Sequence, residues 1–488
     1  MTSTSHRNSR RCSAFARFAI TLLALTLSNP HRTTAAPPNI VLVMADDQGW
    51  GDMAYNGHPL LETPNFDAAA AAGLRMDRFY AAAPVCSPTR AAVMTGRHPN
   101  RMGVFKWGYP LRPQEKTLAD ALRAAGYATA HFGKWHLGSV RRESPVHPGR
   151  HGFDYWLSAP NFFDNDPILS RLGEAVPLAG ESSLVTVDAA VEWIEQSVKG
   201  DALFLAVIWF GSPHNPHRAL EPDRALYSNQ PEKTQHFLGE ITAMDRAFGK
   251  LRDALGELGV RENTLLWYTS DNGALPRLGS AGGHRGRKGD VYEGGLLVPS
   301  IVEWPARINS PRATDFRGNS CDIYPTVLEL AGAEVENQPM LDGVSLVPLI
   351  DAEVASRERP MGFWNHTARG IRTPSAQWMG ELLAAQQAGN DLPPHDVSLR
   401  AAELPQPPHP TDRFPGHSAW IDGDWKLHRI EDDQGPVKWE LYDLASDPRE
   451  QHNRVDAEPA RVAEMRSALE AWLRSVVNSL NGADYDEA

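Results

Sequence analysis

The sequence has few cysteines, no excess of basic residues and no long apolar run beyond its first 36 residues. Only 3 of 488 residues are Cys, which excludes a small scaffold held together by many disulfides. Asp and Glu (60) outnumber Lys and Arg (48), and this balance argues against a nucleic-acid-binding protein. Because the formal net charge is -12, an anionic ligand can be held only by a local cluster of positive side chains.

The composition is that of a folded protein. Hydrophobic residues make up 42% of the chain and charged residues 22%, which excludes a disordered or collagen-like protein. Single hydrophobic cores stop growing at roughly 250–300 residues. The length of 488 residues therefore predicts one large domain and a smaller one.

Residues 1–36 have the features of an export signal. Several arginines and no acidic residue come with an apolar run at residues 18–27, and small residues precede Pro37. The apolar run is too short for a stable membrane anchor. We therefore expect a signal peptide over residues 1–36, export to the periplasm or the medium, and no stable membrane span. An uncleaved N-terminal anchor is the alternative.

Short apolar runs alternate with helical patterns in the first two thirds of the chain. Four runs indicate strands buried on both faces, at residues 40–45, 128–132, 203–210 and 265–268, and a fifth candidate lies at 297–302. Helical patterns fall between them, at residues 118–125, 187–198 and 237–258. This alternation predicts an α/β fold built on a mostly parallel sheet, which we assign to a catalytic domain at residues 37–355.

Polar side chains stand where these predicted strands end. Asp46 and Asp47 follow the first strand, Lys134 and His136 the second, His214 the third, and Asp271 and Asn272 the fourth. Any one pair could belong to an ordinary solvated turn. However, ligands of such sheets bind beyond the carboxyl ends of the strands, so four strand ends of this kind predict one functional site.

The character of the sequence changes after residue 355. Residues 373–415 are rich in Ala, Pro and Gln and indicate a partly helical insertion or a surface loop. Residues 418–429 and 439–442 predict two antiparallel strands, and a helix is expected at 460–480. We interpret residues 356–488 as a smaller α+β subdomain.

Cys86 begins a distinctive local motif. Pro88 suits the first turn of a helix with Ser87 as its cap, which would place Cys86 at the helix N-terminus. The helix dipole there favours negative charge, so the site could lower the pKa of a thiol or bind an anion. Arg90 lies one helical turn further on. Cys321, in contrast, begins a pattern typical of a buried helix that ends at Gly332; a disulfide between the two cysteines is the alternative in an exported protein.

Cys86-Ser87-Pro88-Thr89-Arg90 resembles the C-x-P-x-R signature of the type I, formylglycine-dependent sulfatases, and residues 84–96 fit the extended pattern. Further segments are similar to the family at residues 46–52, 126–138, 213–216, 270–273, 288–295 and 441–448. The resemblance covers nearly all of the chain after residue 36. It implies an alkaline-phosphatase-like sandwich with a large mixed, mostly parallel sheet flanked by helices, and a smaller C-terminal antiparallel sheet.

The resemblance also implies a mechanism. A maturation enzyme would convert Cys86 to formylglycine, whose hydrated form is a gem-diol: one hydroxyl attacks sulfur and the other later expels sulfate. By the same resemblance, Arg90 and His136 hold the diol and His136 accepts a proton. Lys134 and Lys288 bind the sulfate, His214 gives a proton to the departing alcohol, and Asp271 can act as a base.

Asp46, Asp47, Asp271 and Asn272, with the modified Cys86, would be the metal ligands. Oxygen ligands suit Ca²⁺ or Mg²⁺ and not zinc, and the family resemblance favours one Ca²⁺. Read alone, Lys288 could belong to a solvated basic loop at residues 284–289, and His214 could pair with His217 to stabilise a loop.

The sequence therefore predicts hydrolysis of sulfate esters. Residues 151–156 and Asn161 are similar to a segment of N-acetylgalactosamine-6-sulfatases and related polysaccharide sulfatases, which favours a sulfated saccharide, small or polymeric, as substrate. Two alternatives stay open. One is a phosphodiesterase or phosphonate monoester hydrolase of the same superfamily. The other is a binder of sulfated glycans without catalysis, if Cys86 is not modified.

Overall fold

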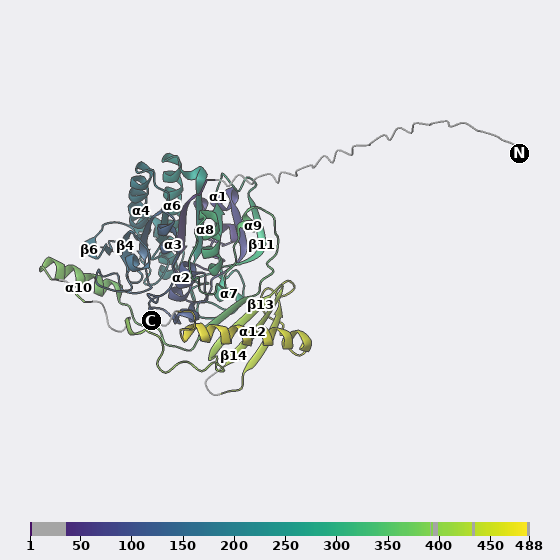
Figure 1. Ribbon diagram of the computed structural model, residues 1–488. Coiled ribbons are helices and arrows are strands. Elements are labelled where there is room, and N and C mark those ends of the chain that lie inside the picture. Colours follow the sequence, from purple (N-terminus) through teal and green to yellow (C-terminus); the bar gives the residue numbers. More distant parts are fainter. Residues whose placement is uncertain (2–35, 391, 394–398, 432–434, 486–488) are drawn as a thin grey trace. The chain divides into compact units, whose positions relative to one another are not determined.

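A mixed sheet of 11 strands, formed between Asn39 and Asn319, lies within residues 37–488, which form one compact unit (Figure 1). The computed structural model describes Met1 and residues 36–390, 392–393, 399–431 and 435–485. The predicted signal peptide lies almost entirely outside the described residues and stays a prediction. Among the helices that the structure describes, none is both long and apolar enough to cross a membrane.

The order of the strands in the large sheet is β11-β2-β10-β8-β1-β7-β3-β4-β5-β6, and β9 pairs with β2. Strands β8, β1, β7, β3 and β4 are parallel, whereas β10 and β5 run antiparallel to their neighbours. The strands are β1 (Asn39–Ala45), β2 (Leu74–Tyr80), β3 (Ala128–Lys134), β4 (Tyr155–Ala159), β5 (Ile168–Arg171), β6 (Glu174–Pro177), β7 (Phe204–Trp209), β8 (Thr264–Ser270), β9 (Leu297–Val298), β10 (Ile301–Glu303) and β11 (Arg312–Asn319). The predicted α/β fold with a mostly parallel sheet is confirmed.

Helices cover both faces of this sheet. They are α1 (Pro64–Ala72), α2 (Cys86–Thr95), α3 (Leu118–Ala124), α4 (Ser182–Lys199), α5 (Glu221–Ala225), α6 (Glu232–Glu257), α7 (Glu293–Leu296), α8 (Ile323–Ala331) and α9 (Val347–Ile350). Successive side chains of a strand point to opposite faces. Ile40 and Leu42 therefore pack with α2, α3 and α8, and Val41 and Val43 pack with α1, α4 and α6.

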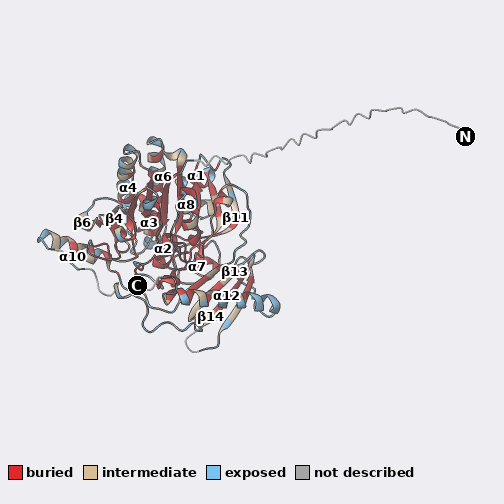
Figure 2. Cartoon of the chain, in the orientation of Figure 1, coloured by how far each residue is buried: buried red, intermediate tan, exposed pale blue. Residues whose placement is uncertain are grey.

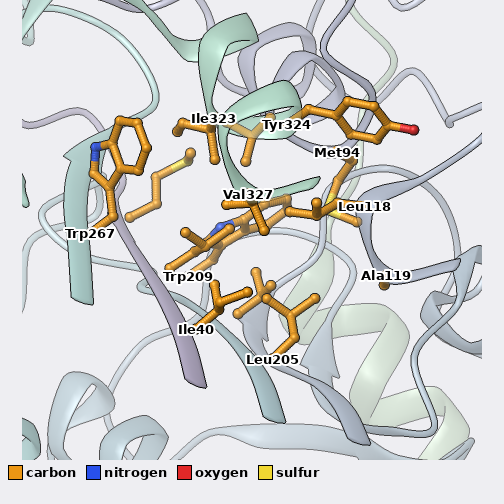
Figure 3. Packing of buried hydrophobic residues seen from close by; sticks show 14 of the residues in the cluster. Ile40, Met94, Leu118, Ala119, Leu205, Trp209, Trp267, Ile323, Tyr324 and Val327 are labelled. Carbon is orange, nitrogen blue, oxygen red and sulfur yellow. The ribbon is translucent and has the colours of Figure 1, made fainter. Parts of the chain in front are cut away.

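Buried aromatic and aliphatic side chains fill both interfaces. Figure 3 shows the first one, where Trp209 of β7 lies beneath Val327 of α8 and near Leu118 of α3. The strands are buried on both faces, whereas the outer surfaces of α4 and α6 are exposed (Figure 2). This explains why the central strands appear in the sequence as continuous apolar runs.

Gly133 allows two strands to approach closely just before the site. Its φ is 89°, and a Cβ at this position would lie 2.0 Å from the Trp209 carbonyl oxygen. Only glycine fits both conditions. The chain can therefore deliver Lys134 to the edge of the sheet directly beside β7.

A second sheet of four antiparallel strands follows, in the order β12-β13-β14-β15. Its strands are β12 (Met361–His366), β13 (Gly416–Asp422), β14 (Trp425–Glu431) and β15 (Lys438–Asp443), with α10 (Ser375–Gln387) in the first connection and α12 (Pro459–Leu480) at the end. The prediction of one strand at residues 418–429 is wrong, because the chain turns at Gly423 and forms two strands. The candidate strand at 297–302 is divided between β9 and β10.

Buried charges hold the small sheet against the catalytic part of the chain. Lys426 of β14 lies 2.9 Å from Glu293 and 3.1 Å from Glu450, and all three side chains are buried. His428 lies 2.7 Å from the same Glu450. Phe363 and Ile421 belong to the same buried cluster as Val291 and Leu296. The predicted boundary at residue 355 stays a prediction, since the compact unit includes both sheets.

We expect Lys426→Ala to lower the free energy of unfolding by about 3–5 kcal/mol, because it leaves two buried carboxylates without their cation. Urea unfolding followed by tryptophan fluorescence measures the change. Lys250→Ala is the matched control, since Lys250 pairs with Asp188 on the surface and should cost less than about 1 kcal/mol. Equal losses in the two variants would contradict a stabilising role for the buried pair.

Candidate active site

The strand-end residues meet at one edge of the large sheet. β8, β1, β7 and β3 are adjacent and parallel, so their carboxyl ends lie side by side. Asp46 and Asp47 follow β1, and Asp271 and Asn272 follow β8. Lys134 is the last residue of β3. The structure therefore brings these side chains together, as the rule for parallel sheets leads one to expect.

Cys86 is the first residue of α2 and is 2% exposed. Its Sγ and carboxylate oxygens of Asp46 and Asp271 lie within 4.8 Å of one another. The prediction of Ser87 as helix cap is wrong: Val85 occupies the cap position, and the Ser87 hydroxyl accepts a hydrogen bond from the Gly108 amide (2.9 Å). Ser87 thus ties the start of α2 to the segment around residue 108.

Both described cysteines are unpaired. Cys86 and Cys321 are free and buried, which leaves the alternative of a disulfide without support. Cys321 lies in a short 3-10 turn directly before α8, and that helix ends at Gly332. Cys321 packs with Ala82 and Ala92 and is part of the core.

Arg90 is fixed by three hydrogen bonds. Its Nε and Nη2 donate to Oδ2 of Asp271 (3.1 and 2.6 Å), and its Nη1 donates to the Lys134 carbonyl (3.0 Å). The guanidinium also lies 5.1 Å from the centre of the Trp209 ring. A buried guanidinium with charge-assisted bonds on several sides has little freedom to move.

Two lysines neutralise the carboxylates after β1. Lys134 donates to Oδ2 of Asp46 (2.6 Å), and Lys288 donates to both carboxylate oxygens of Asp47 (2.5 and 2.7 Å). The Asp47 amide donates to Oδ1 of Asp271 (3.1 Å). Asp47 has a φ of 73°, so the backbone leaves the regular strand path directly after β1. Lys288 therefore belongs to the site and not to a solvated loop.

The two adjacent aspartates titrate in opposite directions. Burial raises the pKa of Asp46 to about 8, although Lys134 partly opposes this effect. Burial also acts on Asp47, but the charges of Lys288 and His214 outweigh it and lower the pKa of Asp47 below its usual range. The buried Asp46 carboxylate is therefore less well compensated by positive charge than Asp47 is.

Oxygen atoms suitable for a metal ion gather at the same point. Oδ1 of Asp46 and Oδ1 of Asn272 are buried and have no hydrogen-bond partner among the described residues. Asp47, Asp46 and His214 also present ligand atoms within 4.8 Å of one another. Unpaired buried oxygens are costly, and a carboxylate-amide set of this kind fits a hard cation such as Ca²⁺ or Mg²⁺.

A cavity of about 550 Å³ opens above these groups. Its lining residues are Cys86, Trp107, His136, Asn161, Phe162, His214, Asn215, Lys288, Arg372, Thr373 and Pro374. The Phe162 ring stacks on the imidazole of His214 with 4.5 Å between centroids. Nε2 of His136 lies 3.3 Å from the Thr373 hydroxyl. His217 stands apart, with its Nδ1 3.2 Å from Glu240.

Burial sets the protonation of the cavity residues. It lowers the pKa of His214 to about 3 and that of His136 well below its usual value, with the Lys134 charge adding to the effect on His136. Burial also raises the pKa of the Cys86 thiol, and Lys134 and Lys288 only partly offset it. Desolvation therefore outweighs the lowering of the thiol pKa that the helix terminus was expected to produce.

Several cavity residues were not predicted as functional. Trp107 and Arg372 belong to none of the recognised motifs, and Thr373 was included only in the predicted insertion at 373–415. Asn161 was noted within a similar segment, whereas Phe162 beside it was not. Arg372 and Thr373 lie in the connection between β12 and α10, whereas Trp107 precedes α3 and Phe162 follows β4. No local pattern in the sequence indicates that these three segments meet at the cavity.

Comparison with known proteins identifies the class. A family model described as Sulfatase matches residues 38–333, more than half of the chain. The chain is 36% identical to arylsulfatase A of Bos taurus over 384 residues, which cover 72% of this chain and 75% of that protein. It is 34% identical to N-acetylgalactosamine-6-sulfatase of Canis lupus familiaris over 350 residues, 64% of this chain and 66% of that protein.

A solved structure agrees in fold. The crystal structure of Ps i-CgsB in complex with k-i-k-neocarrahexaose matches with a TM-score of 0.74 and 25% identity, covering 90% of this chain and 93% of that one. The chain belongs to the sulfatase family. It is a sulfatase enzyme, and the predicted family is confirmed.

The neutral site histidines make stability depend on pH. The pKa of His214 is about 3 in the folded protein and about 6.5 when unfolded, so the unfolded chain alone gains this proton as pH falls. The contribution of His214 to the free energy of unfolding is therefore fully present above about pH 6.5. It falls by about 1.4 kcal/mol per pH unit as the pH drops toward about 3. Urea unfolding of wild type and His214→Gln at about pH 7.5 and about pH 5 tests this. An unchanged pH dependence in the variant would contradict it.

Proposed function

We propose that this sulfatase hydrolyses sulfate esters of saccharides with a nucleophile formed from Cys86 and a Ca²⁺ ion held by the carboxylates after β1 and β8. The single observation that carries the proposal is the position of Cys86. It begins α2 at the floor of the cavity, with its Sγ within 4.8 Å of carboxylate oxygens of Asp46 and Asp271. A maturation enzyme would convert Cys86 to formylglycine, which supplies a hydroxyl that attacks sulfur and is later regenerated.

The positive side chains would bind the sulfate oxyanion. Lys288 lines the cavity, and Lys134 and Arg90 lie beneath it. Each is held by a carboxylate, so the cations are fixed before the substrate arrives. Fixed charges in a buried site stabilise developing negative charge without reorganisation. Arg90 would also hold the modified residue 86 in position.

The two histidines would move protons. His136 is neutral, and its buried Nδ1 has no partner among the described residues, so it can accept the proton released when sulfate is expelled. His214 points Nδ1 at the Asn215 carbonyl (2.6 Å), which can only accept, so Nδ1 carries the hydrogen and Nε2 is free to take a proton. A bound sulfate would raise the His214 pKa, and Nε2 could then donate to the departing alcohol.

Asp46, Asp47, Asp271 and Asn272, with an oxygen of the modified Cys86, would hold the cation. The unpaired oxygens of Asp46 and Asn272 support this assignment. When bound, Ca²⁺ would withdraw negative charge from a sulfate oxygen. Asp271 would also be placed to accept a proton from the attacking hydroxyl, since its carboxylate lies beside residue 86.

A saccharide is the substrate class that the site and the relatives favour. The dog relative is named for a sulfated amino sugar, and the Ps i-CgsB crystal contains k-i-k-neocarrahexaose. A cavity of about 550 Å³ is large enough for a sugar residue. We further propose that residues 1–36 direct export, so that the enzyme meets its substrate in the periplasm or the medium.

Hydrolysis of 4-nitrophenyl sulfate compared with bis(4-nitrophenyl) phosphate separates this proposal from its first alternative. A sulfatase has the higher kcat/KM for the sulfate ester, whereas a phosphodiesterase of the superfamily prefers the phosphate diester. Binding of sulfated sugars without turnover, after expression with the maturation enzyme, would instead indicate a binding protein.

Cys86→Ala should reduce kcat by at least about 1,000-fold, because no other side chain replaces the nucleophile. Inorganic sulfate should still bind, as measured by calorimetry. Cys321→Ala is the matched control: this second buried cysteine lies in the core, and its replacement should preserve turnover. Mass spectrometry of the peptide that contains residue 86 should show formylglycine. Retained activity in Cys86→Ala, or only unmodified thiol in the active wild type, would refute the nucleophile.

Calcium binding should release protons and tighten as pH rises. The Asp46 carboxyl, with its pKa of about 8, must lose its proton to bind the ion, so affinity should increase up to about tenfold per pH unit between roughly pH 6 and pH 8. Calorimetry in two buffers of different ionisation enthalpy measures both affinity and proton release. Asp46→Asn should bind Ca²⁺ more weakly and with a flatter pH dependence. An affinity independent of pH in the wild type would contradict the assignment.

A further inference from the structure

One cation in the cavity differs from all the others. Arg90, Lys134 and Lys288 each contact a carboxylate of the site. Arg372 also lines the cavity, yet no acidic side chain within the described part of the chain forms an ion pair with it. An exposed guanidinium without a partner, at the wall of a site for anions, is available to a ligand.

The backbone on both sides of Arg372 is anchored. The Ile371 amide donates to the Trp107 carbonyl (2.9 Å), and the Asn161 side-chain amide donates to the Thr373 carbonyl (3.1 Å). The Thr373 hydroxyl also lies 3.3 Å from His136. The segment before α10 is therefore fixed across the mouth of the cavity, although no side chain among the described residues forms an ion pair with Arg372 that would hold it away from a ligand.

Trp107 forms an apolar wall beside this cation. Its side chain is 45% exposed although it is one of the largest apolar groups in the protein. A Cβ at Gly370 would lie 2.0 Å from the indole ring, so the Gly370 backbone packs directly on the ring and fixes it. Exposed aromatic rings in a cavity bind the apolar faces of ligand rings at a low entropy cost.

We propose that Arg372 and Trp107 form a specificity subsite for a sugar ring that carries a second anionic group, in addition to the sulfate that is cleaved. This inference rests on the proposed function and names the substrate class more closely: a polyanionic saccharide. Trp107 contacts the sugar ring, and Arg372 pairs with the second anion. A sulfate and a carboxylate both match the fork of the guanidinium, so the chemistry is shared between a disulfated sugar and a sugar linked to a uronic acid.

The net negative charge of the protein is a further reason for a second anionic group of the substrate to need a cation of its own. The chain has a formal net charge of -12, so a polyanion is repelled at long range. The lysines and Arg90 are already neutralised by carboxylates or committed to the scissile sulfate. An additional anionic group therefore needs a cation of its own, and Arg372 is placed to provide it.

Affinities in the Cys86→Ala background test the subsite without turnover. For galactose and for N-acetylgalactosamine, calorimetry compares the 6-sulfate with two relatives: the 4,6-disulfate, and the 6-sulfate linked to glucuronic acid. We expect at least one doubly charged ligand to bind about tenfold more tightly than its 6-sulfate, the gain of one charge-assisted contact. Tighter binding of the 4,6-disulfate identifies the second anion as a sulfate, and tighter binding of the sugar linked to glucuronic acid identifies it as a carboxylate.

Arg372→Gln should bring that affinity ratio close to one. Arg369→Gln is the matched control, because Arg369 lies three residues earlier, is exposed and does not line the cavity. It should leave the ratio unchanged. Trp107→Ala should weaken all the sugars, singly and doubly charged alike, by a similar factor. Thermal unfolding of each variant confirms that it is folded.

Two results would overturn the proposal: no preference for either doubly charged ligand, or a preference that survives Arg372→Gln. Failure of the proposed function is distinguishable from both. It would appear as the absence of hydrolysis of 4-nitrophenyl sulfate by the matured wild type, which is measured separately from these affinities.

Discussion

The site depends on a balance of buried charges at the carboxyl edge of the large sheet. Asp46, Asp47 and Asp271 face Arg90, Lys134 and Lys288, and five of these six side chains are fully buried. Removing ions from water is expensive, and the cost is recovered only when each ion is paired with good geometry. The sheet supplies that geometry, because adjacent parallel strands deliver the three carboxylates to one point. The same balance leaves the unpaired oxygens that suit a cation.

The four-stranded C-terminal sheet helps to hold the loop that carries Lys288. The side-chain amide of Asn365 in β12 donates to the carbonyl of Gly289, the residue after Lys288 (2.7 Å). The Gly289 amide in turn donates to the Pro84 carbonyl (2.9 Å), two residues before Cys86. The lysine loop is therefore held between the small sheet and the start of α2. The small sheet also carries the connection that places Arg372 and Thr373 in the cavity wall.

The sequence predicted the central fold and the convergence of the strand-end residues, because both follow from buried apolar runs and the geometry of parallel sheets. It did not predict β2 and β11, whose charged side chains interrupt the apolar pattern at half-buried or exposed positions. The hairpin at Gly423 was taken for one strand because its turn is short. Trp107 and Arg372 were missed for another reason. Their place in the cavity depends on a contact between segments 264 residues apart, which local patterns do not record.

The burial of Cys86 has a consequence for the order of events in biosynthesis. Every residue of α2 is buried, and the thiol lies at the floor of the cavity beneath Lys288 and the histidines. In the folded protein, neither Cys86 nor its neighbours in α2 are exposed to a second enzyme. If Cys86 is converted as proposed above, modification and folding compete for the same segment, and the conversion has to precede the burial of α2.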